Sequence, residues 1–150
     1  MAACFWCVIF LVLFWIIHAD PRDDVVARSC RQSKVQNSSI YVNSYSKIVK
    51  TMEEEMVRNK FSFNEVGEPP DRLHVFAQCM ADLSGEECKI CFNQMKTLLS
   101  SCFPSTGGRV YADGCFIRVE NYSFFDETLG PNDLKVFLLL FKKKKKVSYT

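Results

Sequence analysis

The sequence predicts one α+β domain cross-linked by disulfides, and three observations carry the prediction. Two segments repeat apolar residues at helical spacing, while two other regions alternate apolar and polar residues as strands do. The 150 residues have the length of one domain, and 48% hydrophobic with 24% charged residues is ordinary for a folded protein. Six of the eight cysteines lie beyond residue 19, and this even number favours disulfides.

The first nineteen residues have the character of a secretory signal peptide. They contain no Asp, Glu, Lys or Arg, and the apolar run 5–17 is shorter than the roughly 20 residues that span a bilayer. Ala19 offers a small residue for cleavage before Asp20. An uncleaved signal anchor is the alternative, and both interpretations place the remaining chain outside the cytosol. We expect a signal peptide at 1–19 and a mature chain without a membrane span.

The charge balance gives no case for a nucleic-acid partner. The formal charge is +2, but residues 20–125 carry 13 basic and 14 acidic groups. A protein that binds nucleic acid needs a basic surface to neutralise phosphates. We therefore expect no nucleic-acid binding.

The first helical segment begins near Ser38 or Ser39, since either serine is a suitable N-cap. The apolar residues that follow are spaced by four, three, four and four, and they are Tyr41, Tyr45, Ile48, Met52 and Met56. Such spacing places them on one side of an amphipathic helix. Charged residues occupy mostly the other side, as expected of a solvated face.

The period changes to two beyond Asn59. Phe61 and Phe63 alternate with polar residues, and a second alternating run covers 73–78 after a loop that contains two prolines. These runs predict two antiparallel strands. His74 lies in the second run, and no other histidine beyond residue 19 accompanies it to complete a metal or catalytic site.

A second helix follows Ser84, which forms the capping-box pattern S-x-x-E with Glu87. Cysteines share the apolar face of this helix, which comprises Cys88, Cys91, Phe92, Met95, Leu98, Leu99 and Cys102. Three interpretations compete: a redox C-x-x-C pair, a zinc site and structural disulfides. We favour disulfides, but six cysteines allow 15 pairings and the residues alone do not choose among them.

A hairpin is predicted next, with strands at 109–112 and 115–120 on either side of Asp113-Gly114. In such a hairpin, Arg109 and Glu120 lie diagonally on one face within reach of each other. They form either an ordinary cross-strand ion pair or a set of donors and acceptors for a polyol such as a sugar.

The cysteine pattern C-x8-C-x2-C at 79–91 carries a family resemblance, together with Cys102, the segment 108–110 and the segment 115–124. From about Cys30 to Phe125 the chain resembles the ginkbilobin-2 homologous domain. This domain is the extracellular module of plant cysteine-rich receptor-like kinases, cysteine-rich repeat secretory proteins and plasmodesmata-located proteins. The resemblance implies an α+β fold with two helices packed on a five-stranded antiparallel sheet. It also implies the disulfides Cys30–Cys102, Cys79–Cys88 and Cys91–Cys115.

The resemblance further implies a candidate sugar site. Family members similar to ginkbilobin, an antifungal seed protein, bind mannose through an Asn, an Arg and a Glu, and the matching positions here are Arg31, Arg109 and Glu120. Arg31 departs from the family, because an amide both donates and accepts hydrogen bonds whereas a guanidinium only donates.

Two functions are consistent with this pattern, and both belong to a secreted protein of plant defence or signalling in the apoplast. One is a mannose-type carbohydrate-binding antifungal lectin. The other is a non-lectin protein-interaction module that resembles a receptor-like kinase ectodomain, or a truncated product of such a gene. Its expected partners are therefore mannose-containing glycans or an extracellular protein.

We expect no enzymatic activity, cofactor or metal ion. The sequence offers no Ser-His-Asp set, no glycine-rich phosphate loop and no metal cluster. A thiol oxidoreductase is the enzymatic alternative, since Cys88 and Cys91 lie at a helix start.

Asn37 and Asn121 begin Asn-x-Ser acceptors and are glycosylation candidates.

We assign residues 20–125 to the domain and 126–150 to an atypical, disordered tail. In the tail, Leu134–Phe141 precedes five lysines, and its longest apolar run of six residues is too short to cross a membrane. The tail is a frayed amphipathic end, a basic segment that touches an anionic surface, or the product of a truncated or misjoined gene. We favour the last.

Overall fold

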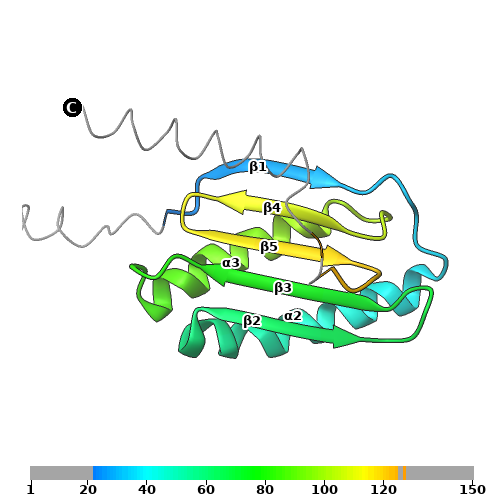
Figure 1. Ribbon diagram of the computed structural model, residues 1–150, viewed down its shortest axis with the longest axis horizontal. Coiled ribbons are helices and arrows are strands. Elements are labelled where there is room, and N and C mark those ends of the chain that lie inside the picture. The colour runs from blue at the N-terminus through cyan, green and yellow to red at the C-terminus, as the bar shows by residue number, and fades with distance from the viewer. Residues whose placement is uncertain (1–21, 125–126, 128–150) are drawn as a thin grey trace, which may run out of the picture.

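The computed structural model describes residues 22–124 and Glu127. Within these residues, two helices pack on one face of a five-stranded antiparallel sheet with the order β1-β4-β5-β3-β2 (Figure 1). The elements are β1 Val25–Cys30, α2 Ser38–Asn59, β2 Phe61–Val66, β3 Leu73–Cys79, α3 Gly85–Ser100, β4 Gly108–Ala112 and β5 Cys115–Glu120. The predicted α+β architecture is confirmed.

Two predicted segments fall largely outside this range. The expected signal peptide at 1–19 is not among the described residues, and the expected tail at 126–150 is represented only by Glu127. Within the described range, neither helix combines the length and apolar character that a membrane span requires.

Helix α2 begins one position earlier than predicted, so the assignment of its N-cap to Ser38 or Ser39 was wrong. The cap is Asn37, whose Oδ1 accepts a hydrogen bond from the backbone N–H of Ile40 at 3.1 Å. Buried Asp71 in turn accepts hydrogen bonds from the backbone N–H groups of Gln36 at 3.0 Å and Asn37 at 2.7 Å. A contact from a distant loop therefore selects the first residue of the helix.

The predicted apolar side of α2 faces the core. Its Tyr41, Ile48, Met52 and Met56 are buried, while Tyr45 is partly buried and donates its hydroxyl to the carbonyl of Lys96 at 2.8 Å.

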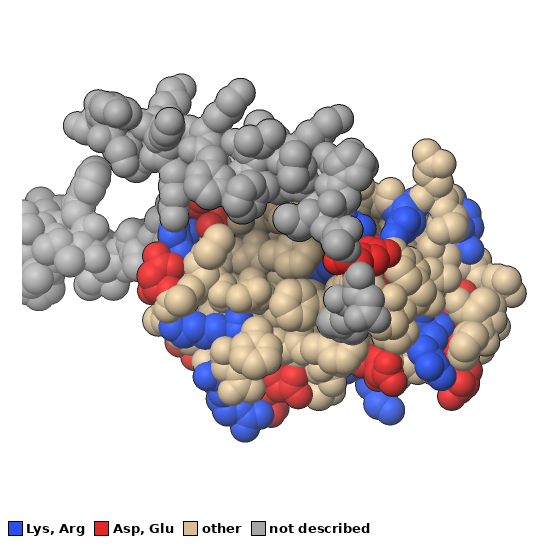
Figure 2. Space-filling model, viewed as in Figure 1, with Lys and Arg blue, Asp and Glu red and all other residues tan. Residues whose placement is uncertain are grey.

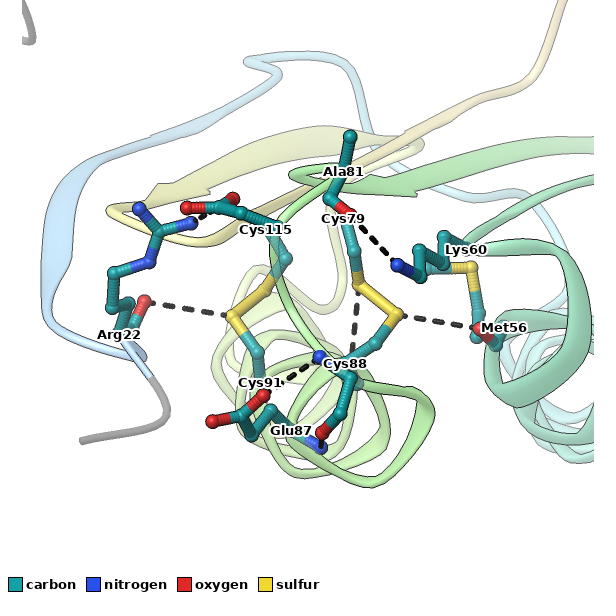
Figure 3. Close-up of a disulfide and its surroundings, with 11 residues drawn as sticks. Arg22, Met56, Lys60, Cys79, Ala81, Glu87, Cys88, Cys91 and Cys115 are labelled. Carbon is teal, nitrogen blue, oxygen red and sulfur yellow. Dashed lines mark hydrogen bonds and ion pairs between the residues drawn. A yellow bond between two sulfur atoms is a disulfide. The ribbon is translucent and has the colours of Figure 1, made fainter. Parts of the chain in front are cut away.

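Helix α3 begins with the predicted capping box. Ser84 accepts from the backbone N–H of Glu87, and the Glu87 carboxylate accepts from the backbone N–H of Ser84. Among the described residues there are three disulfides, Cys30–Cys102, Cys79–Cys88 and Cys91–Cys115, which is the pairing that the family resemblance implies. Figure 3 shows two of them joining the start of α3 to the last residue of β3 and to the first residue of β5.

The two faces of the sheet differ in what covers them. The helices cover a face built from buried residues such as Val75, Ala77, Val110 and Ile117, and they lie behind the sheet in Figure 1. The opposite face carries no helix among the described elements, and we call it the open face.

Strand β2 turns its small polar residue inward and its phenylalanines outward. Ser62 is buried and donates to the Glu55 carboxylate of α2, which also accepts from Asn64 at 2.9 Å. Because side chains alternate along a strand, Phe61 and Phe63 point to the open face.

The hairpin of β4 and β5 has the predicted two-residue turn and register, with Arg109 opposite Arg118. A Cβ on Gly114 of this turn would lie 2.9 Å from Leu83 Cδ1 and 3.0 Å from the Arg22 carbonyl oxygen. The glycine thus allows the turn to approach its neighbours closely.

Candidate functional site

The three predicted site residues meet at one end of the open face. Arg31 directly follows β1, Arg109 is the second residue of β4, and Glu120 is the last residue of β5. The backbone N–H of Arg31 donates to the Gly107 carbonyl at 2.9 Å, which holds Arg31 beside the start of β4.

The Glu120 carboxylate contacts three guanidinium groups. Its Oε2 lies 2.7 Å from Arg31 Nε, and its Oε1 lies 2.9 Å from Arg118 Nε and 3.4 Å from Arg109 Nη2. Only 1% of the Glu120 side chain is exposed. Both carboxylate oxygens are therefore engaged by arginines of the same chain.

Three further residues complete this group, and the sequence analysis did not include them. Arg118 Nη2 lies 2.5 Å from Glu127 Oε2, and the Tyr122 hydroxyl donates to Glu127 Oε1 at 2.6 Å. Arg31 also donates to the Tyr122 hydroxyl. The period of two is a signal that could have found Arg118, because it places Arg118 on the strand face of Glu120, but nothing in the sequence indicates that Glu127 returns to it.

We call these six residues the arginine–carboxylate cluster: Arg31, Arg109, Arg118, Glu120, Tyr122 and Glu127. Its three cations and two carboxylates nearly neutralise one another. The hydrogen bond to Glu120 raises the pKa of the Arg31 guanidinium, and hydrogen bonds from Tyr122 and Arg118 lower the pKa of the Glu127 carboxyl. Burial, with the hydrogen bond to Glu127, raises the pKa of the Tyr122 hydroxyl.

Aromatic rings and a backbone segment enclose the cluster. The guanidinium carbon of Arg118 lies 4.1 Å from the centre of the Phe124 ring, and that of Arg31 lies 5.2 Å from the Tyr122 ring. A Cβ on Gly107 would lie 2.8 Å from Glu120 Oε2. The space around the carboxylate is thus filled by protein atoms on several sides.

The arrangement is suited to holding chain segments together. It links the residue after β1, strands β4 and β5, and the chain beyond β5 through charge-assisted hydrogen bonds. Because the Glu120 side chain is 1% exposed beneath these arginines, a sugar hydroxyl could reach it as an acceptor only if an arginine moved aside.

The other residues named in the sequence analysis make no contact with the arginine–carboxylate cluster that is suited to binding or catalysis. His74 is buried opposite Glu120, and its Nδ1 lies 3.4 Å from Glu65 Oε2 without hydrogen-bond alignment. Of the glycosylation candidates, Asn37 caps α2, while Asn121 donates its amide to the Pro70 carbonyl at 3.3 Å. Over 22–124 and Glu127, no three His, Cys, Asp or Glu residues are grouped so as to hold a metal ion.

Comparison with known proteins identifies the module. A family model described as salt stress response/antifungal matches residues 29–122. The chain is 41% identical over 115 residues to cysteine-rich receptor-like protein kinase 46 of Arabidopsis thaliana, a match covering 77% of this chain and 18% of the kinase. It is 41% identical over 56 residues to the antimicrobial ginkbilobin-2-like protein of Castanea crenata, covering 37% of this chain and 23% of that protein.

The fold agrees with these matches. The tandem DUF26 ectodomain of the Arabidopsis thaliana cysteine-rich receptor-like protein PDLP5 superposes with a TM-score of 0.62 at 22% identity, covering 67% of this chain and 51% of that one. The chain spans about a fifth of the kinases' length and about half of this ectodomain. It therefore belongs to the salt stress response/antifungal family, as a cysteine-rich extracellular module like those of receptor-like kinases and ginkbilobin-like antimicrobial proteins.

Proposed function

We propose that this module works in the plant apoplast, in defence or signalling, by binding a protein rather than mannose and without catalysing a reaction. The observation that carries the proposal is that Glu120 is buried and paired with arginines of the same chain. Its carboxylate is 1% exposed, and both oxygens face guanidinium groups within 3.4 Å. A glutamate that binds a sugar must offer an accessible lone pair to a hydroxyl.

The free energy of the Arg31–Glu120 hydrogen bond is large compared with that of binding a single sugar. A hydrogen bond to a charged group contributes about 1.5–3 kcal/mol, and Arg31 makes such a bond to Glu120 at 2.7 Å. A monosaccharide bound with a millimolar Kd gains only about 4 kcal/mol in total. Displacing Arg31 would consume much of that gain, so we expect no useful mannose affinity.

Arg31 provides the matched test. Arg31→Asn removes the guanidinium from Oε2 and introduces the amide that mannose-binding relatives carry, while Arg109 and Glu120 remain. We expect the wild-type chain to give no signal on mannan or on a glycan array. A wild-type signal that Arg109→Ala abolishes, with the fold retained by circular dichroism, would overturn the proposal and establish a lectin.

The lectin remains the second candidate because one specific observation favours it. Arg109 and Glu120 occupy the family's mannose-binding positions and lie 3.4 Å apart. The similarity to an antimicrobial ginkbilobin-2-like protein is compatible with this reading. The glycan experiment separates the two candidates.

Secretion is part of the same proposal. Three disulfides support an oxidising compartment, and the relatives include a putative cysteine-rich repeat secretory protein. Expression of the full chain in plant cells, with recovery from apoplastic fluid and an N-terminus at Asp20, is the expected result. Retention of residues 1–19 on the product would contradict cleavage.

A further inference from the structure

A cavity of about 300 Å³ lies between the helices and the sheet. Tyr41 and Tyr45 line it from α2, Leu99 lines it from α3, and Val119 lines it from β5. We call it the tyrosine cavity. Figure 2 views the open face, with charged groups mostly at its margin, whereas the tyrosine cavity belongs to the helix side of the sheet. Every residue that lines it lies in the described part of the chain, and none belongs to the arginine–carboxylate cluster.

The lining of the tyrosine cavity is mostly apolar and runs from the surface into the core. Val42 and Phe103 are exposed residues at its mouth, whereas Leu99 and Val119 are buried inside. The Phe103 ring lies 6.3 Å from the ring of Tyr41. Pockets for small molecules have this composition and begin at about 300 Å³, and a cavity of about 150 Å³ already holds benzene. The tyrosine cavity therefore has room for a molecule of about two rings.

One buried hydroxyl in this lining has no partner. Tyr45 donates to the Lys96 carbonyl at 2.8 Å, and Ser100 donates to the Thr97 carbonyl at 2.6 Å. Tyr41 is only 7% exposed, and no residue in the described part of the chain forms a hydrogen bond with its hydroxyl. The hydroxyl oxygen is not one of the side-chain atoms that are sealed from solvent without a partner, so it stays reachable from the cavity. A bound molecule with an acceptor would satisfy this donor, which is costly to leave unpaired.

The charges around the tyrosine cavity select a neutral molecule. Its lining residues include no Lys, Arg, Asp or Glu, so an anion that entered would lose water without gaining a counter-charge. Burial first, then the negative charges of Glu120 and Asp71, raises the pKa of Tyr41 to about 12. At neutral pH the Tyr41 hydroxyl is therefore protonated and donates, and the same negative charges repel an anion.

We propose that the tyrosine cavity binds a neutral, mainly apolar small molecule of about two rings, with a carbonyl oxygen that accepts a hydrogen bond from the Tyr41 hydroxyl. The apolar lining supplies the burial, and the single free donor orients the ligand. For a molecule of this size, we expect a Kd on the order of 0.1 mM. The proposal goes beyond the proposed function and does not depend on it, because the cavity and Glu120 lie on opposite sides of the sheet.

The test is a titration of the ¹⁵N-labelled full chain with 2-acetylnaphthalene, followed by amide chemical shifts up to about 1 mM ligand. Saturable shifts are expected at Tyr41 and at Gly107, which also lines the cavity. Tyr41→Phe keeps the ring and removes the donor, so it should raise the Kd about threefold to tenfold. Ser46→Trp places a large ring at the mouth, since Ser46 lines the cavity and is exposed, and should abolish binding. Thr51→Trp is the matched control, because Thr51 is exposed on α2 but does not line the cavity.

A second ligand tests the charge argument. The anion 2-naphthoate has nearly the same shape, and it should bind at least tenfold more weakly than 2-acetylnaphthalene. The proposal is overturned if the wild type shows no saturable shifts, if both ligands bind equally, or if Ser46→Trp and Thr51→Trp bind alike. An unchanged Kd in Tyr41→Phe overturns the role of the hydroxyl; circular dichroism checks that each variant is folded. Mannose binding by the wild type would refute the proposed function and leave this inference standing.

Discussion

Replacing Glu120 with glutamine tests whether the arginine–carboxylate cluster stabilises the fold. The substitution keeps the shape of the side chain and removes one negative charge. Arg118 and Arg109, with side chains 10% and 19% exposed, would then keep Glu127 as their carboxylate partner among the described residues, whereas Arg31 is 40% exposed and can turn to water.

The expected loss follows from these exposures. Removing one partner of a buried ion pair costs about 3–5 kcal/mol. Arg118 keeps Glu127 at 2.5 Å and the amide oxygen of glutamine as acceptors, so the lower end applies, about 3 kcal/mol of unfolding free energy. For a domain of this size that corresponds to a decrease in Tm of roughly 12–24 °C.

The assay is guanidinium chloride unfolding at neutral pH with the disulfides intact, followed by far-ultraviolet circular dichroism. Glu127→Gln is the matched control, because Glu127 is 39% exposed and its ion pairs are worth less, about 1 kcal/mol or below. If Glu120→Gln loses less than about 1 kcal/mol, or if the two variants lose equal amounts, the cluster does not hold the fold as we argue.

Three other predictions concern the core and its turns. Asp71→Ala should cost about 3 kcal/mol in the same unfolding assay, because Asp71 accepts two backbone hydrogen bonds before α2; Asp71→Asn should cost about half, and equal losses would contradict this. Burial first, then the charges of Glu120 and Asp71, raises the pKa of Tyr41 to about 12. The folded state thus keeps the Tyr41 proton, and this contribution to stability is complete below about pH 10 and lost as pH rises toward 12. Absorbance at 295 nm should show late ionisation of two tyrosines, because burial also raises the pKa of the Tyr45 hydroxyl; Tyr41→Phe should lower the amplitude of this late phase, and an unchanged amplitude would refute the assignment. Gly114→Ala should destabilise by about 1 kcal/mol, because its Cβ meets Leu83 at 2.9 Å, and a neutral effect would show that the turn relaxes.

Local patterns predicted most of the architecture. The capping box at Ser84 and Glu87 involves residues three apart, and the apolar side of α2 follows from helical spacing alone, so neither depends on the rest of the fold. The family resemblance supplied the strand number and the cysteine pairing, which spacing leaves open.

The orientation of β2 and the N-cap of α2 could not be predicted, because contacts between distant segments determine them. Alternation in β2 established that Phe61 and Ser62 point to opposite faces, but the contact of Ser62 with Glu55 of α2 decides which faces the helices. The N-cap likewise had several eligible polar residues, and Asp71 from another loop accepts from the backbone of Asn37.

The position of the candidate site was predicted, but the contacts that Glu120 makes with the chain's own arginines were not. Strand register brought Arg109 to Glu120, as the sequence indicated. Arg31, which follows β1, reaches the carboxylate only in the folded chain, whereas Arg118 lies two residues before Glu120 on β5 and shares its strand face. Because of these ion pairs, we interpret the same residues as a structural cluster and not as a sugar site.

The central claim is that Glu120 is engaged by the chain's own arginines and does not recognise a sugar. Calorimetric titration of methyl α-D-mannoside into the wild-type chain, up to about 50 mM so that even millimolar affinity is visible, tests it most directly. We predict no saturable heat. Saturable binding by the wild type that Arg109→Ala removes, with the fold intact, would contradict the account.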